Sequence, residues 1–193
     1  MLYKINIEII NLILFINIIN YIINKMLKTI TIIPTQFKYG ETYGDFYKMC
    51  ADPKYSNAIC LFNDNHEQWL LADPKSQSFN DHINHSPGSG NAMCRPFQIN
   101  GDSIGIPTGP YTSLNQVVKL ADGTNVTVKT IIDMAYKRII DLFIKLPHKN
   151  TLYYSVNNLN SKIIGLGIFY NIVGDDVTNY ITESIHNIPN HFL

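Results

Sequence analysis

The segment from Val128 to Leu146 has the pattern that most restricts the fold of this chain. Its apolar residues recur at positions 128, 131, 132, 135, 139, 142, 143 and 146, the spacing of one face of an amphipathic helix. Thr127 is suited to cap the first turn, and Pro147 ends the segment. Directly afterwards, Thr151–Val156 is rich in β-branched and aromatic residues and predicts a strand. A helix beside strands of this kind indicates an α/β fold.

The rest of the chain after position 26 continues this alternation. Leu27–Ile33 predicts a strand that Pro34 ends, and Asp45–Asp52 predicts a short helix. Ala58–Phe62 is a continuous apolar run, typical of a strand buried on both faces. Residues 72–91 predict a long loop, residues 121–124 a turn, and residues 175–188 a second helix that ends at Pro189.

Residues 1–25 form a separate extension that is rich in Ile and Asn. Ile5–Asn24 covers about 20 positions, the length that spans a bilayer, although Glu8 and several Asn residues interrupt it. Two interpretations stay open: a membrane anchor, or a non-functional leader upstream of Met26. We therefore divide the chain into the extension, 1–25, and one α/β domain, 26–193.

Charge and cysteine content exclude several classes of function. The 15 basic and 15 acidic residues balance, and Lys and Arg neither cluster nor alternate with aromatic residues, which argues against nucleic-acid binding. Cys50, Cys60 and Cys94 are odd in number, widely spaced and without a C-x-x-C motif, so we expect buried free thiols in a reducing compartment. His82 and His85 lie in a polar stretch, where a solvated loop is favoured over a metal site. We expect a protein of the cytoplasm, or one anchored to a membrane and facing a reducing compartment.

Asn63, Asp64 and Asn65 follow the apolar run 58–62, at the place where open α/β sheets bind ligands. An Asn amide offers both a donor and an acceptor to a hydroxyl group. The alternative is an Asx-turn, in which the side chain bonds only its own backbone.

Two glycine segments carry the second signal for a ligand. Pro87–Ala92 contains Gly88, Ser89, Gly90 and Asn91, and glycine there lets backbone N–H groups approach phosphate oxygens. The segment matches neither common nucleotide-binding motif. Arg95 follows closely, and its guanidinium group is suited either to pair with an anion or to form an ordinary salt bridge. In Gly165–Phe169 two glycines precede an aromatic ring, and the alternative is a packing turn with Phe169 in the core.

The order of these parts resembles the macro domain, an ADP-ribose-binding module. The matching pieces are Ala58–Asn65, Pro87–Ala92, Ile104–Tyr111, Val128–Leu146, Thr151–Val156 and Gly165–Phe169, within residues 58–188. The Asn63-Asp64-Asn65 segment is one residue shorter than the Asn-Ala-Ala-Asn of the family, and Gly88-Ser89-Gly90 replaces its triple glycine.

The resemblance implies a three-layer sandwich with a mixed central sheet flanked by helices. It further implies that Asn63 and Asn65 contact ribose hydroxyls. The backbone of the two glycine segments would hold the diphosphate, and Phe169 would lie beside the ribose. The ligand-binding residues expected on this basis are Asn63, Asn65, Gly88, Ser89, Gly90, Asn91, Gly165, Gly167, Ile168 and Phe169.

The implied function is binding of ADP-ribose, or of an ADP-ribosylated protein, without a cofactor or a metal; hydrolysis stays open. A hydrolase needs a base near the anomeric carbon, and Asp64 is the best placed carboxylate, with Glu67 and Asp102 as alternatives. The competing hypothesis is a membrane-tethered interaction protein without catalytic activity.

Overall fold

The computed structural model describes residues 13, 15–17, 19, 28–72, 88–160, 162–166 and 172–193. Most of the extension 1–25, including 15 of the 20 residues of Ile5–Asn24, therefore lies outside the described residues, as do His82 and His85. Within the described part, no helix has both the length and the apolar character needed to cross a bilayer.

Within the described residues, four parallel strands form the central sheet, in the order β1-β6-β2-β3, and β4 and β5 form a separate antiparallel pair. The elements and their bounds are β1 (Thr31–Gln36), α2 (Phe46–Ala51), η1 (Pro53–Tyr55), β2 (Ala58–Asn65), α3 (His66–Leu71), η2 (Gly90–Asn100), β3 (Ser103–Gly109), β4 (Val117–Lys119), β5 (Asn125–Thr127), α5 (Val128–Lys145), β6 (Thr151–Val156), α6 (Asp175–His186) and η4 (Ile188–His191).

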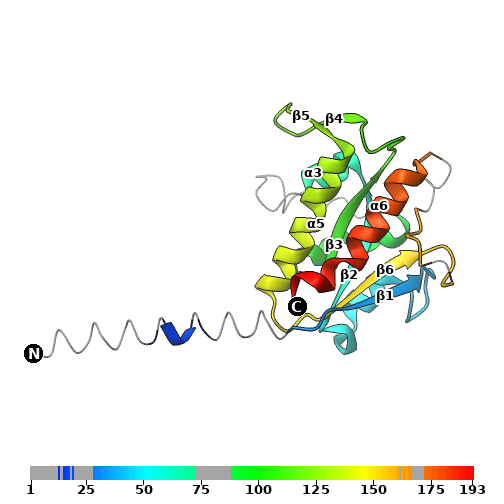
Figure 1. The fold of residues 1–193 in the computed structure, drawn as a ribbon. Helices are drawn as coiled ribbons and strands as arrows, with labels where there is room; N and C mark the ends of the chain where they lie inside the picture. Colours follow the sequence, from blue (N-terminus) through cyan, green and yellow to red (C-terminus); the bar gives the residue numbers. More distant parts are fainter. Residues whose placement is uncertain are drawn as a thin grey trace, which may run out of the picture.

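Strand β2 is buried on both faces, as its continuous apolar sequence predicts. Ile59 and Leu61 belong to the larger core cluster, which α5 and α6 cover, whereas Cys60 and Phe62 belong to a second cluster with side chains from α2 and η2. Successive side chains of a strand point to opposite faces, so the two clusters mark the two faces of the sheet. Figure 1 shows α5 and α6 side by side over one face. The described fold is thus α/β, with helices flanking a parallel sheet.

The long amphipathic helix is confirmed almost to the residue. Helix α5 begins after Thr127, whose side chain accepts from the Thr130 N–H at 3.3 Å, and it ends at Lys145. Six of its apolar side chains are buried in the core. Strand β6 has the predicted bounds, and the turn at 121–124 joins β4 to β5, with Gly123 at a φ of 85°.

Three predictions of local structure differ from what is observed. Pro34 does not end the first strand but lies inside β1, which tolerates it because β1 is an edge strand. Asn63 and Asp64 belong to β2 and not to a loop, since parallel pairing with β3 continues beyond Phe62. The described strands of the central sheet are all parallel, where the resemblance predicted a mixed sheet.

Candidate functional site

The strands β6, β2 and β3 are neighbours and run parallel, so their carboxyl ends lie side by side, along the edge of the sheet where the strands end. Strand β2 brings Asn63 and Asp64 to this edge, β3 leads into Tyr111, and β6 brings Ser155. The predicted glycine residue Gly165 lies there too. We call this group of residues the carboxyl-end cluster.

Asn63 and Gly165, which are 102 positions apart in the chain, are in direct contact. The Asn63 side-chain amide donates to the Gly165 carbonyl oxygen, and the Ser155 hydroxyl lies 3.4 Å from the same oxygen. A Cβ at Gly165 would lie 2.7 Å from Asn157 Oδ1 and 2.8 Å from Asn157 N. Glycine is needed at 165 because the two backbone segments approach each other closely. The structure therefore joins two of the predicted ligand segments.

Asp64 forms a buried ion pair with Arg95 of η2. The Arg95 Nη2 to Asp64 Oδ1 distance is 2.7 Å, and the side chains are 5% and 1% exposed, respectively. The Arg95 guanidinium carbon also lies 5.8 Å from the centre of the Phe62 ring. Arg95 therefore neutralises a carboxylate inside the protein. Of the two roles expected for Arg95, an anion contact or a salt bridge, the structure shows the salt bridge, and this salt bridge is buried.

The surroundings of Asp64 penalise its negative charge. Burial raises the pKa of Asp64 to about 6, although the positive charge and hydrogen bond of Arg95 act in the opposite direction. The neighbouring Gly105 leaves room for this carboxylate, because a Cβ there would lie 3.1 Å from Asp64 Oδ2. A carboxylate of this kind holds or releases a proton within the range where enzymes operate.

Tyr111 and His66 form a second polar pair beside Asp64. The Tyr111 hydroxyl lies 2.8 Å from His66 Nδ1, and His66 Nε2 lies 2.8 Å from the Lys119 carbonyl oxygen. A carbonyl only accepts, so in the neutral imidazole Nε2 carries the proton and Nδ1 accepts from Tyr111. Burial, and next the charge of Asp64, raise the pKa of Tyr111 above its usual value.

Two atoms of the carboxyl-end cluster lack a hydrogen-bond partner among the described residues. Asn63 Oδ1 and Asp64 Oδ2 are both buried and both unpaired. An unpaired buried acceptor costs about 1–3 kcal/mol of desolvation, so most such groups in proteins are satisfied. Each of these acceptors is therefore a place where a donor from a ligand or from water would be stabilising.

The other predicted ligand residues have local roles. Asn65 Oδ1 accepts from the Gln68 N–H at 2.8 Å and caps α3, as in the Asx-turn alternative. The Gly88 N–H donates to the Ala92 carbonyl at 3.3 Å, and the Gly165 N–H donates to Ser155 O at 2.8 Å. These two N–H groups are thus engaged within the chain in this structure.

Several predicted residues lie elsewhere or outside the described part. Gly90 and Asn91 form the start of η2, and Ser89 precedes it at the N-cap position; Ser89 and Gly90 are exposed. Gly167, Ile168 and Phe169 lie outside the described residues. Glu67 is exposed in the first turn of α3. Asp102, the other alternative base, precedes β3 at the opposite edge of the sheet and pairs with Lys149, so it is excluded from the carboxyl-end cluster.

Sequence reasoning missed the partners of Asp64 and Tyr111. Arg95 was noted for an anion or a salt bridge, but no local pattern pairs it with a residue 31 positions away. His66, the partner of Tyr111, lies directly after the Asn63–Asn65 segment. This position was the only sign in the sequence that His66 lies near the candidate site.

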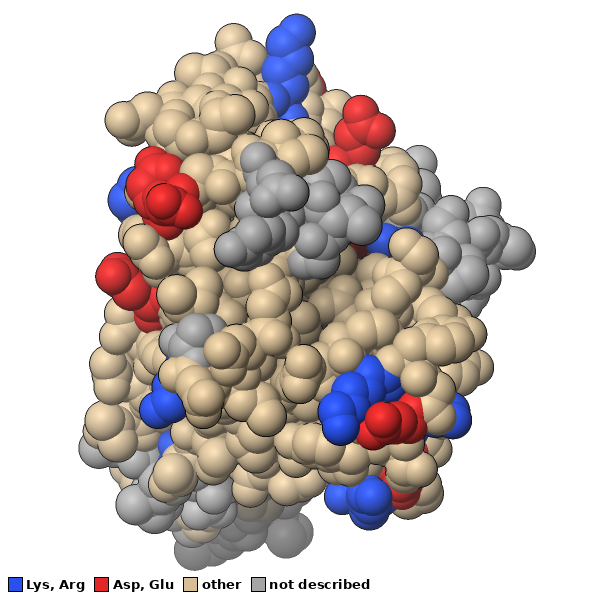
Figure 2. Space-filling model, turned by 90° about the vertical axis from the view of Figure 1, so that its right-hand side faces the viewer, with Lys and Arg blue, Asp and Glu red and all other residues tan. Residues whose placement is uncertain are grey.

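The surface carries few charges on the face shown in Figure 2. Basic and acidic side chains are scattered there among uncharged ones, without a basic patch. Within the described ranges, no group of three or more His, Cys, Asp or Glu side chains is arranged to hold a metal ion.

Comparisons with models of protein families, with curated proteins and with solved structures gave no match for this chain.

Proposed function

We propose that the carboxyl-end cluster binds the ribose of ADP-ribose or of a related ADP-ribosyl group. The observation that carries the proposal is a pair of buried acceptors, Asn63 Oδ1 and Asp64 Oδ2, that have no partner among the described residues. Acceptors need donors, and a sugar offers hydroxyl donors, whereas a phosphate ester at neutral pH offers mainly acceptors.

The position of Asn63 supports a hydroxyl contact. Its amide nitrogen is held by the Gly165 carbonyl, so the side chain is fixed with Oδ1 as the remaining acceptor. A side chain fixed in this way loses little conformational entropy when a ligand binds. The contact also brings the Asn63 segment together with the glycine segment that begins at Gly165, the two segments expected to enclose one ligand.

Asp64 is the base in the hydrolytic form of this proposal. Its Oδ1 pairs with Arg95, which leaves Oδ2 to accept a proton from an attacking water molecule. A pKa of about 6 is suited to this role, since the carboxylate is mostly ionised at neutral pH and still basic enough to accept a proton. Consecutive residues of a strand point to opposite faces, so Asn63 and Asp64 would serve different groups of the ligand.

Replacing Asn63 by alanine should weaken ADP-ribose binding about tenfold, because one buried hydrogen bond contributes about 1–1.5 kcal/mol. Isothermal titration calorimetry of the full chain with ADP-ribose measures the change. The matched control is Asn57→Ala, since Asn57 lies just before β2, at the other end of the same strand, and bonds Asn150. This control should bind as tightly as the unaltered chain. The absence of heat and of a thermal shift with millimolar ADP-ribose would contradict the proposal.

If the protein hydrolyses an ADP-ribosyl bond, its rate should rise as the pH increases through about 6, because Asp64 must lose its proton to act as a base. At pH 5 the rate should be about a tenth of its plateau. The Asp64→Asn variant keeps an acceptor for Arg95 and should lose this pH-dependent rate while ADP-ribose still binds. A rate that is independent of pH between 5 and 8 would remove Asp64 from the mechanism.

A further inference from the structure

The three cysteines, far apart in the sequence, belong to one cluster at the end of β2 opposite the carboxyl-end cluster. Cys60 of β2 and Cys94 of η2 are buried together, and the half-buried Cys50 of α2 packs against them. All three side chains thus belong to one buried cluster between α2, β2 and η2. Spacing in the sequence gave no sign of this contact, since it depends on the packing of α2 and η2 on the same face of the sheet.

One backbone carbonyl group connects Cys50 with Cys60. The Cys50 thiol donates to the Asp102 carbonyl oxygen at 3.4 Å, and this same oxygen accepts the Cys60 N–H at 2.9 Å. Cys94 is directed elsewhere, because its thiol donates to the Asn91 carbonyl at 3.1 Å. The Cys60 backbone N–H therefore shares its acceptor with the Cys50 thiol, and the Cys94 thiol has a different one.

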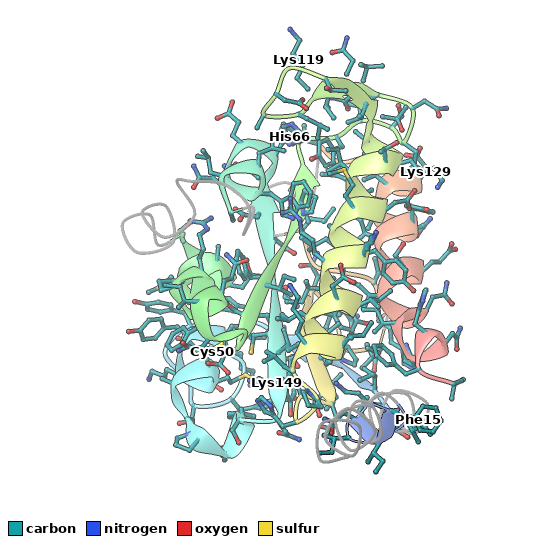
Figure 3. The ribbon with its side chains drawn as sticks, turned by 90° about the vertical axis from the view of Figure 1, so that its left-hand side faces the viewer. Phe15, Cys50, His66, Lys119, Lys129 and Lys149 are labelled. Atoms are coloured by element: carbon teal, nitrogen blue, oxygen red, sulfur yellow. The ribbon has the colours of Figure 1, made fainter. Side chains whose placement is uncertain are left out.

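A buried cation lies at the same end of the sheet. The Lys149 ammonium, 1% exposed, donates to Asp102 Oδ1 and, at 2.8 Å, to the Ala58 carbonyl oxygen. Figure 3 places Cys50 and Lys149 at one end of the molecule and His66 at the other. The neighbouring thiols of Cys60 and, next, Cys94, aided by the positive charge of Lys149, lower the pKa of Cys50 to about 5, against the effects of burial and of Asp102.

The other two thiols, Cys60 and Cys94, have raised pKa values and are buried. The hydrogen bond with Cys50, followed by burial, raises the pKa of Cys60, and burial raises the pKa of Cys94. One thiol is thus partly accessible and favoured as a thiolate, while its neighbours are enclosed and protonated. This asymmetry is typical of a reactive cysteine beside a resolving cysteine.

We propose that Cys50 is a site of oxidation by hydroperoxides and that Cys60 resolves it as an intramolecular disulfide. The Cys50 thiolate attacks one peroxide oxygen, the O–O bond breaks, and the leaving hydroxide takes a proton to become water. The Cys60 sulfur then attacks the Cys50 sulfenic acid, the S–O bond breaks, and the second hydroxide leaves as water with the Cys60 proton. Two thiols are oxidised, and one hydrogen peroxide is reduced to two water molecules.

Peptide mapping of the full chain after treatment with hydrogen peroxide tests this assignment. Trypsin would place Cys50, Cys60 and Cys94 in three different peptides, residues 49–54, 55–75 and 76–119, since Pro96 protects the bond after Arg95. We expect one equivalent of peroxide to join the first two peptides and to leave Cys94 free. A link between Cys50 and Cys94, or no loss of thiols relative to an untreated sample, would overturn the proposal.

Single substitutions separate the roles of the three thiols. Cys50→Ala should leave Cys60 and Cys94 at least tenfold less reactive than Cys50 is in the unaltered chain. Cys60→Ala should accumulate a sulfenic acid that a 1,3-dione reagent traps at Cys50, whereas the matched Cys94→Ala should still form the disulfide. Equal oxidation of Cys60 with and without Cys50 would contradict the proposed order. If a variant does not fold, the peptide map of the unaltered chain decides by itself.

Discussion

Replacing Arg95 by methionine should lower the free energy of unfolding by about 3–5 kcal/mol at pH 8 and by distinctly less at pH 5. The substitution keeps an apolar stem of similar length but leaves the Asp64 carboxylate buried without its cation. Asp64 is 3% exposed, so water cannot replace the lost partner. Urea unfolding followed by circular dichroism at the two pH values measures the effect.

The dependence on pH follows from the pKa of Asp64. Burial raises this pKa to about 6 in the folded chain even with Arg95 in place, and the loss of Arg95 raises it further. A carboxyl group whose pKa is higher in the folded state binds protons more tightly there than in the unfolded state, so the variant gains stability as the pH falls below the folded pKa. The loss should therefore shrink between pH 8 and pH 5.

Lys129→Met is the control, because Lys129 also pairs with a carboxylate, Asp133, but both side chains are about half exposed. Water solvates the Asp133 carboxylate when the cation is removed, so we expect a much smaller loss that is the same at both pH values. An equal loss of unfolding free energy for Arg95→Met at pH 5 and pH 8 would show that the buried Asp64 carboxylate is not the cause of this loss.

Elements with a strong local pattern were predictable from the sequence. The apolar stripe of α5 and the β-rich run of β6 each depend on neighbouring residues, and both appear within one residue of their expected bounds. Pro34 misled the prediction because its effect depends on whether a strand is at an edge, which is a property of the whole sheet.

The candidate site was predictable only in part. Asn63 and Asp64 were found because they follow an apolar run, and Gly165 because glycines mark close backbone approaches. The Asp64–Arg95 pair and the thiol cluster depend on how η2 folds against β2, and no sequence spacing encodes that contact. Asn65 shows the converse: its sequence suited either a ligand or a local Asx-turn, with the turn favoured, and the structure assigns its oxygen to the cap of α3.

Replacing Lys149 by methionine should lower the free energy of unfolding by about 2–3 kcal/mol, since a hydrogen bond that involves a charged group contributes about 1.5–3 kcal/mol. The ammonium connects the start of β2, through the Ala58 carbonyl, with Asp102 before β3. Methionine fills much of the space but leaves Ala58 O without this donor. The side chain of Asp102 is 25% exposed, so water solvates part of its charge, and the loss should be smaller than for Arg95→Met.

The same substitution has a second expected effect, on Cys50. The positive charge of Lys149 contributes to the low pKa of Cys50, so its removal should raise that pKa and slow alkylation of Cys50 by iodoacetamide at about pH 5, where the thiolate fraction depends on this pKa. Lys129→Met is the control, because Lys129 pairs with Asp133 on the exposed face of α5, remote from the thiols. It should change neither the unfolding free energy appreciably nor the alkylation rate. If Lys149→Met destabilises the chain while Cys50 reacts as before, Lys149 contributes to the stability of the fold but not to the reactivity of Cys50. That reactivity then arises from the two neighbouring thiols.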